Sequence, residues 1–217
     1  MMVYLRAFGK LLISVGVGIL LFVAYTLWGT GIYTAREQSR LEREFSAAPR
    51  LSGAQGGGGG SGAPPKNYRP KPGEPVFEMK IPAIDVEKIV VEGVGTEELR
   101  VAPGHYPECR RGFDPPLCTP FDEIFPGEPG RVVVSGHRTT YGAPFWALNE
   151  LTDGDEIRIG TKWGRYVYEV TRKDIVDPNS AFVIRQTENA EMVLTTCNPR
   201  FSAEQRLIVY ARMATPA

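Results

Sequence analysis

The side chains with the greatest potential for chemistry in this sequence follow apolar segments. Cys197 comes directly after the run Met192–Thr196, and Arg206 opens the next apolar segment after a turn rich in turn-forming residues. His137 follows the short run VVVSG. If the segments around Cys197 and Arg206 pair as antiparallel strands, these two side chains lie near the same end of a sheet.

Thiol, imidazole and guanidinium groups together can carry out acyl transfer. A thiol is a nucleophile as the thiolate, and a nearby histidine or arginine favours that form. An imidazole can protonate a leaving amine and later deprotonate an attacking one. A guanidinium is always charged, so it can stabilise a developing oxyanion or orient a carbonyl. We therefore treat Cys197, His137 and Arg206 as candidate catalytic residues.

Each of these residues has a more ordinary interpretation when it is taken alone. A single cysteine at the end of a strand is more often a packed small apolar residue. A single histidine after a strand is usually a polar surface or capping residue, and a single arginine usually makes a surface ion pair. Periodicity and spacing leave both interpretations open.

Composition restricts the kinds of site that this chain can form. The 217 residues include 25 basic and 25 acidic side chains, and zero net charge removes the broad electrostatic case for a nucleic-acid partner. Two histidines cannot form a three-histidine zinc site, and three scattered cysteines cannot form a four-thiolate site. We predict no metal and no cofactor.

The N-terminal part of the chain contains a candidate membrane span. Residues 11–35 carry no charge, and a helix of this length can cross a hydrocarbon core of ~30 Å. A cleaved signal peptide is the alternative, since Arg6 and Lys10 precede the apolar run, but its apolar core is usually only about 7–15 residues long. We predict a tail at 1–10 and an uncleaved transmembrane anchor at 11–33.

Residues 34–75 are predicted to form a juxtamembrane helix followed by a linker. The part up to Glu44 has a helix-forming composition, whereas Gly53–Gly62 hold seven glycines and Pro64–Pro75 hold five prolines. The glycine-rich and proline-rich stretches cannot bury enough apolar surface to fold alone. We therefore expect a tether that holds one compact domain, residues 76–217, above a membrane.

This domain has a sequence pattern of short strands with few helices. We expect a helical turn at Thr96–Leu99 and a short helix at Ala143–Leu151. The expected strands are Val76–Ile81, Val86–Val91, Arg131–Ser135, Glu156–Gly160, Tyr166–Arg172, Ala181–Ile184, Met192–Thr196 and Leu207–Arg212. This pattern indicates a mainly β fold, either a closed barrel or a sandwich.

Two separated motifs resemble those of the sortases, membrane-anchored cysteine transpeptidases of Gram-positive bacteria. The string Val193-Leu194-Thr195-Thr196-Cys197, followed by Arg206, is similar to the family pattern Thr-Leu-x-Thr-Cys and departs from it only at Val193. The segments Ser135–Phe145 and Gly104–Pro107 resemble class E, the actinobacterial housekeeping type. The resemblance covers residues 76–213.

The resemblance implies a fold, catalytic roles and partners. It implies an eight-stranded sortase-type β-barrel in which Cys197 is the nucleophile, His137 the general acid and base, and Arg206 the oxyanion or substrate-orienting residue. The implied reaction cleaves an LPxTG-like or LAxTG-like C-terminal sorting signal of a surface protein between Thr and Gly. The amine of a lipid-linked cell-wall precursor then resolves the thioacyl enzyme. Tyr141 and Thr196 are the predicted substrate-binding residues, although Tyr141 can instead simply pack in the loop after His137.

The other two cysteines lie in Glu108–Pro126, which is longer than expected for this family. Outside the cytoplasm, so short a loop closes readily into a disulfide, and we predict a Cys109–Cys118 bridge with Cys197 free. Two free thiols are the alternative. His105 is expected to be structural, as a polar cap on the surface.

Charges beside the apolar run are mixed, so the orientation is inferred from the domain that follows it. We predict a single-pass membrane protein with a cytoplasmic N-terminus and an extracellular catalytic domain. The alternatives are a pilin-polymerising sortase and a non-catalytic barrel that binds cell-wall components. An L,D-transpeptidase, also a cysteine enzyme, has its histidine and cysteine close together in sequence, unlike His137 and Cys197.

Overall fold

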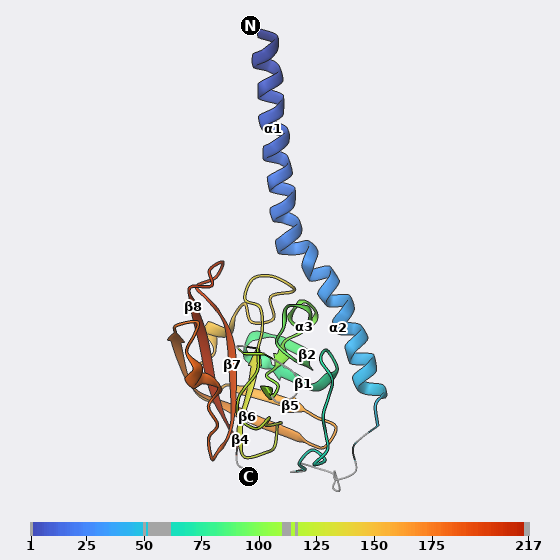
Figure 1. Cartoon of the computed structure of the whole chain (residues 1–217), viewed down its shortest axis with the longest axis vertical. Helices are drawn as coiled ribbons and strands as arrows, with labels where there is room; N and C mark the ends of the chain where they lie inside the picture. Colours follow the sequence, from blue (N-terminus) through green and yellow to red (C-terminus); the bar gives the residue numbers. More distant parts are fainter. Residues whose placement is uncertain (1, 50, 52–61, 110–113, 116, 215–217) are drawn as a thin grey trace.

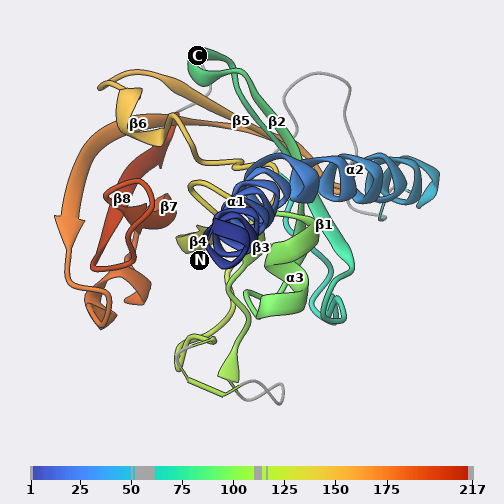
Figure 2. The ribbon, with the colours of Figure 1, turned by 90° about the horizontal axis from the view of Figure 1, so that it is seen from above.

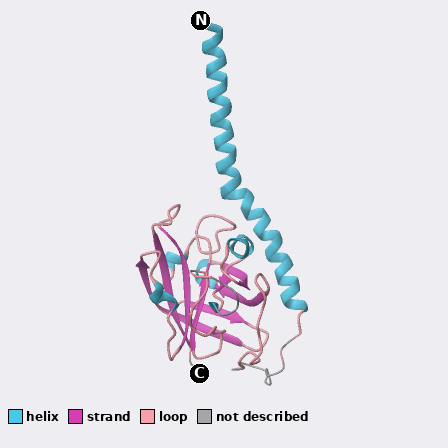
Figure 3. Ribbon diagram, in the orientation of Figure 1, coloured by secondary structure: helices cyan, strands magenta, loops and turns pink. Residues whose placement is uncertain are grey.

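The strands of this protein close into a barrel, as the family resemblance implied. The computed structural model describes residues 2–49, 51, 62–109, 114–115 and 117–214. Most of the predicted glycine-rich linker, at 52–61, lies outside these residues. The eight strands follow one another around the barrel in the order β1-β2-β3-β4-β7-β8-β6-β5. Figure 3 shows that helices are confined to the N-terminal arm and to short segments of the domain.

Strand bounds agree with the sequence pattern at most positions. The strands are β1 Pro75–Ile81, β2 Val86–Glu92, β3 Gly104–His105, β4 Gly130–Ser135, β5 Glu156–Gly160, β6 Arg165–Val176, β7 Ala190–Asn198 and β8 Gln205–Met213. Alternate residues of β1, β5 and β6 point inward and form one core with Trp163 and Leu148. The barrel is therefore filled by side chains and is not a channel.

Two expectations for local structure were wrong, and one strand was not anticipated. Ala181–Ile184 is a turn of 3₁₀ helix and not a strand, because a short apolar run does not distinguish the two by itself. The eighth strand is β3, whose two residues are too few to show any alternation. The expected helix at Ala143–Leu151 is a series of turns with only Leu148–Glu150 in 3₁₀ conformation. The helical turn expected at Thr96–Leu99 is confirmed, as part of the short helix α3, Thr96–Val101.

The N-terminal arm consists of two helices in sequence. Helix α1, Met2–Ala24, is followed by a π-helical turn at Tyr25–Gly29 and by α2, Thr30–Ala47. Within α1, Arg6–Ala24 is long and apolar enough to cross a membrane, and none of this window is buried against the rest of the protein. Figure 1 shows α1 extending away from the barrel while α2 runs alongside it.

The described parts of the expected tether contact the barrel. Leu41 of α2 is fully buried, and Lys162 donates to the carbonyl of Ala48 at 2.7 Å. Tyr68, from the proline-rich stretch, packs edge-on against Phe125 and Trp163 with ring centroids 5.0 and 5.1 Å apart. Both flanks of the linker therefore belong to the folded domain, because their apolar side chains find partners on its surface.

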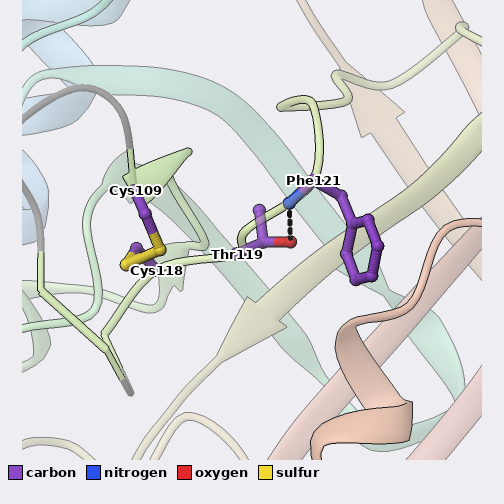
Figure 4. Close-up of a disulfide and its surroundings, with 4 residues drawn as sticks. All are labelled: Cys109, Cys118, Thr119 and Phe121. Atoms are coloured by element: carbon purple, nitrogen blue, oxygen red, sulfur yellow. Dashed lines mark hydrogen bonds between the residues drawn. A yellow bond between two sulfur atoms is a disulfide. The ribbon is translucent and has the colours of Figure 1, made fainter.

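The loop between β3 and β4 carries a disulfide between Cys109 and Cys118, whose Cα atoms lie 4.9 Å apart. Figure 4 shows this bond beside Thr119, whose hydroxyl accepts a hydrogen bond from the Phe121 amide at 3.2 Å. Cys118 is only 1% exposed. Closing a loop of this length stabilises the fold by about 2–3 kcal/mol in the chain-entropy account.

Candidate active site

The parallel pairing of β4 with β7 brings His137 and Cys197 to the same end of the barrel. The two strands are in step through Ser135, which pairs with Thr195. His137 and Cys197 each lie two residues beyond this pair, and Cys197 is still within β7. Strand pairing therefore aligns two residues that are far apart in the sequence.

Gly136 fixes the position of the residue that follows it. Its amide donates to the Thr195 carbonyl at 3.1 Å, and its carbonyl accepts from the Thr196 hydroxyl at 2.7 Å. A Cβ at Gly136 would come within 2.7 Å of the Phe145 ring, so only glycine fits here without a shift of the aromatic side chain. The absence of a side chain at Gly136 thus lets Phe145 pack against the backbone just before His137.

The third candidate, Arg206, lies directly opposite Cys197. The antiparallel pairing of β7 with β8 matches Cys197 with Arg206, and Thr196 with Leu207. The Arg206 guanidinium donates to the carbonyls of Ala203 and Gln205 at 3.0 and 3.1 Å, within the turn that joins the two strands. The structure therefore gathers all three candidates at one strand end, with Cys197 between the other two.

Partial burial changes the acid–base behaviour of this region. His137 is half-buried, and the loss of solvent lowers its pKa below the ordinary value of 6.5. The imidazole is therefore mainly neutral at pH 7 and can accept a proton. Burial also raises the pKa of Tyr106, and the nearby positive charge of Arg206 opposes that rise.

Arg138 is a site residue that the sequence did not single out. This side chain is 5% exposed and donates to the Cys197 carbonyl at 3.1 Å and to Asn198 Oδ1 at 3.1 Å. It also donates to the Trp146 carbonyl at 3.3 Å and to Asn149 Oδ1 at 2.8 Å. One buried guanidinium thus joins the loop after β4 to the end of β7. In the sequence, only its position next to His137 indicated that Arg138 could belong to the site.

The two predicted substrate-binding residues differ in accessibility. Tyr141 is half-buried, and its ring lies 5.0 Å from that of His137, centroid to centroid. Thr196 is 2% exposed, and its hydroxyl donates a hydrogen bond to the Gly136 carbonyl. A substrate contact stays a prediction for both residues, and the structure gives Thr196 a part in holding the backbone before His137.

His105 is buried, so the expectation of a surface cap was wrong. It is 1% exposed, its Nδ1 lies 2.9 Å from Glu92 Oε2, and its Nε2 lies 3.0 Å from the Ile124 carbonyl. Glu92 and His105 pair across β2 and β3, which places a polar cluster inside the domain. With Glu123, they offer three ligand atoms within 4.8 Å of one another, the arrangement among the described residues that could hold a metal ion.

The candidate site faces the side of the domain from which α1 extends. Figure 1 shows the β7–β8 turn and the loop after β4 at this end of the barrel, and of the two the loop after β4 lies nearer the junction of α1 and α2, as Figure 2 also shows. A cysteine, a histidine and an arginine thus lie at adjacent strand ends of a closed barrel. The fold and the site together define the class of protein: a β-barrel with a candidate cysteine acyl-transfer site.

Comparison with known proteins gives this class its name. The sortase domain model matches residues 79–214. Sortase D of Bacillus subtilis is 33% identical over 154 residues, which cover 69% of this chain and 69% of that protein. The chain belongs to the sortase family, whose members are cysteine transpeptidases.

Class E relatives are among the similar proteins, as the histidine region indicated. Sortase SrtE1 of Streptomyces coelicolor is 29% identical, and the match covers 96% of this chain but only 56% of that protein. The crystal structure of sortase E1 from Streptomyces coelicolor with a tripeptide in the active site has a TM-score of 0.56 and 25% identity, covering 68% of this chain and 92% of that one. The predictions of the family and of the eight-stranded barrel are confirmed.

Proposed function

We propose that this protein is a membrane-anchored transpeptidase that acts on the C-terminal sorting signal of surface proteins. It cleaves an LPxTG-like or LAxTG-like motif between Thr and Gly and joins the Thr carbonyl to an amine of a lipid-linked cell-wall precursor. The observation that carries the proposal is the strand pairing that aligns Cys197 with Arg206 on β8 and with His137 after β4.

The chemistry follows from the three groups. Neutral His137 accepts the thiol proton as Cys197 Sγ attacks the Thr carbonyl carbon, and Arg206 stabilises the negative oxygen that forms. When the C–N bond breaks, the His137 imidazolium donates its proton to the departing glycine amine. The incoming amine attacks the thioester, gives a proton to His137, and releases Cys197 as the thiolate, which His137 reprotonates.

Incubation of the protein with a fluorogenic LAxTG or LPxTG peptide, with and without a small amine, tests this function. We expect cleavage between Thr and Gly, and a shift from hydrolysed to amine-coupled product when the amine is added. A peptide with Gly replaced by proline at the scissile bond is the matched control. If the protein binds the peptide without cleaving it, the non-catalytic barrel is the better account.

We expect Arg206→Lys to lower kcat/KM by about a hundredfold, the typical loss for an oxyanion-stabilising donor. Lysine keeps the charge but lacks the planar set of donors that can hold a carbonyl oxygen in one direction. Peptide cleavage rates measure the effect. Arg212→Lys, on an exposed position of the same strand, is the control and should stay near the wild-type rate. Equal rates for Arg206→Lys and the wild type would remove Arg206 from the mechanism.

We also propose that the N-terminus is cytoplasmic and the barrel extracellular. The apolar helix at Arg6–Ala24 and the Cys109–Cys118 disulfide support this orientation, because disulfides persist outside the cytoplasm. In addition, the candidate site faces the side of α1, where a lipid-linked acceptor would be within reach.

A membrane-impermeant maleimide applied to intact cells should attach one label per chain, at Cys197. Cys197 is the free thiol, and the other two cysteines are joined. Mass spectrometry of the purified protein counts and locates the labels. Absence of label on intact cells, with labelling after lysis, would place the barrel on the cytoplasmic side. Three labels would show that the disulfide is reduced.

A further inference from the structure

Helix α2 packs against the closed barrel at β2 and bonds backbone groups that the short strand β3 does not reach. Strand β3 has only two residues and pairs with β2 only at Val91 and Glu92, so β2 lacks a strand partner at Ile89 on that side. The Gln38 side chain takes this place. Its Oε1 accepts from the Ile89 amide at 2.9 Å, and its Nε2 lies 3.1 and 3.2 Å from the carbonyls of Ile89 and Val101. One side chain of α2 thus satisfies backbone groups that a longer strand would otherwise bind.

Apolar packing beside Gln38 holds the helix in place. Leu41 is fully buried in a cluster with Ile89, Val91 and Ala102, and Phe45 packs against the same group. Removing these apolar side chains from water stabilises the contact between the helix and the barrel. The helix is therefore anchored to the barrel along its length, and its first turn is brought to a defined place.

That first turn contacts the loop that follows His137. The Thr30 hydroxyl accepts a hydrogen bond from the Tyr141 amide at 3.2 Å and donates to the Thr26 carbonyl at 2.9 Å. Thr34 lies one turn later in the helix and packs close to Gly142. Its methyl group would be 3.4 Å from a Cβ atom placed on that glycine. Its hydroxyl lies 3.0 Å from the Arg100 carbonyl.

The contacted loop has an unfavourable backbone conformation and is close to the candidate base. Tyr141, Gly142 and Ala143 have φ values of 51°, 72° and 42°, a left-handed region that side chains other than glycine adopt at a cost. Such a loop keeps its shape only when its surroundings hold it. The Tyr141 ring packs 5.0 Å from the His137 ring, and the Phe145 amide donates to the His137 carbonyl at 3.1 Å.

We propose that Thr30 is a positioning residue for His137 and that the juxtamembrane helix is part of the catalytic unit. The hydroxyl of Thr30 holds the Tyr141 backbone, and Tyr141 in turn holds the imidazole in the orientation that proton transfer to and from Cys197 needs. The membrane anchor and the active site are thereby mechanically joined. This inference rests on the proposed transpeptidase function for its catalytic consequence, but not for the geometry.

Thr30→Val in the full-length protein in detergent micelles tests the proposal. Valine has nearly the same shape but cannot accept the Tyr141 amide, and we expect kcat for peptide cleavage to fall about tenfold, the effect of one hydrogen bond. KM should change little. Thr30→Ser keeps the hydroxyl and should restore most of kcat. Ser39→Ala removes an exposed hydroxyl that donates to the Ala35 carbonyl of the same helix, and it should leave kcat unchanged.

A second measurement does not depend on turnover. The protein has two histidines, so their imidazole proton resonances are easily assigned. Thr30→Val should shift or broaden the His137 resonance and leave that of buried His105 in place. If the resonance moves but the wild type never cleaves the peptide, the proposed function fails and the positioning role stands. The proposal is overturned if Thr30→Val leaves kcat and the His137 resonance unchanged, or if serine does not restore kcat.

Discussion

Cys197→Ala is expected to abolish transpeptidation, with a loss of about 10⁴-fold or more in kcat, as for other catalytic nucleophiles. Alanine removes the sulfur that would form the thioester, and the two remaining cysteines are joined in a disulfide. No other thiol can therefore substitute for it. Cleavage of the peptide, followed over hours at high protein concentration, measures the residual rate.

The fold should tolerate this change, which makes the loss informative. Cys197 is half-buried at the end of β7, where the backbone pairing with Arg206 does not require the side chain. Cys197→Ser keeps the size of the group but is a weaker nucleophile, and it should bind the peptide with wild-type affinity while turning over very slowly. A peptide carrying a thiol-reactive trap should modify the wild type at Cys197 and neither variant. Appreciable cleavage by Cys197→Ala would place the nucleophile elsewhere.

His137→Ala is expected to lower kcat by about 10²–10⁴-fold, the usual contribution of a general acid and base. Without the imidazole, the thiol proton has no acceptor and the departing amine has no donor. Added free imidazole should restore part of the rate by entering the space left by the side chain. A variant that retains wild-type kcat would show that another group transfers the proton.

The pH dependence of the wild type follows from the same residue. Burial lowers the pKa of His137 below 6.5, so the base stays neutral at pH 7 and becomes protonated only in more acidic solution. The rate should therefore fall on the acid side of pH 6.5, and the imidazole resonance of His137 in Cys197→Ala should titrate below that value. The same shift means that the contribution of His137 to folding stability is complete above pH 6.5 and is lost as the pH falls through its folded pKa.

The three candidate residues could be predicted from the sequence because they lie beside apolar segments and because two short motifs around them resemble those of the sortases. Cys197 and Arg206 flank a single turn between two apolar segments, so their pairing across β7 and β8 follows from the hairpin alone. His137 follows a run of valines, whose β-branched side chains favour a buried strand. The residues that contact these three and hold their surroundings in place could not be predicted from the sequence. Arg138 and Thr30 have no distinctive spacing, and their roles depend on which carbonyl or amide the fold brings to them.

The secondary structure was predicted wrongly where a segment is too short to show a periodic pattern of apolar residues. Ala181–Ile184 has the composition of a strand but forms one helical turn, and β3 has two residues whose strand character is decided by their neighbours β2 and β4. The two-residue length of β3 also leaves the gap beside β2 that Gln38 of α2 fills. A helix expected to be a spacer is therefore packed and hydrogen-bonded against the barrel.

The sequence by itself determined the mainly β class of fold, the three candidate catalytic residues, the apolar N-terminal helix and the cysteine pair, because each depends on composition, alternation or a short motif. Only the tertiary structure decided that His137 and Cys197 are in step on parallel strands, that His105 is buried against Glu92, and that α2 contacts the loop after His137. The reason is physical. Local patterns set which face of a segment is buried, but contacts between distant segments follow from strand register and helix docking, which depend on the whole chain.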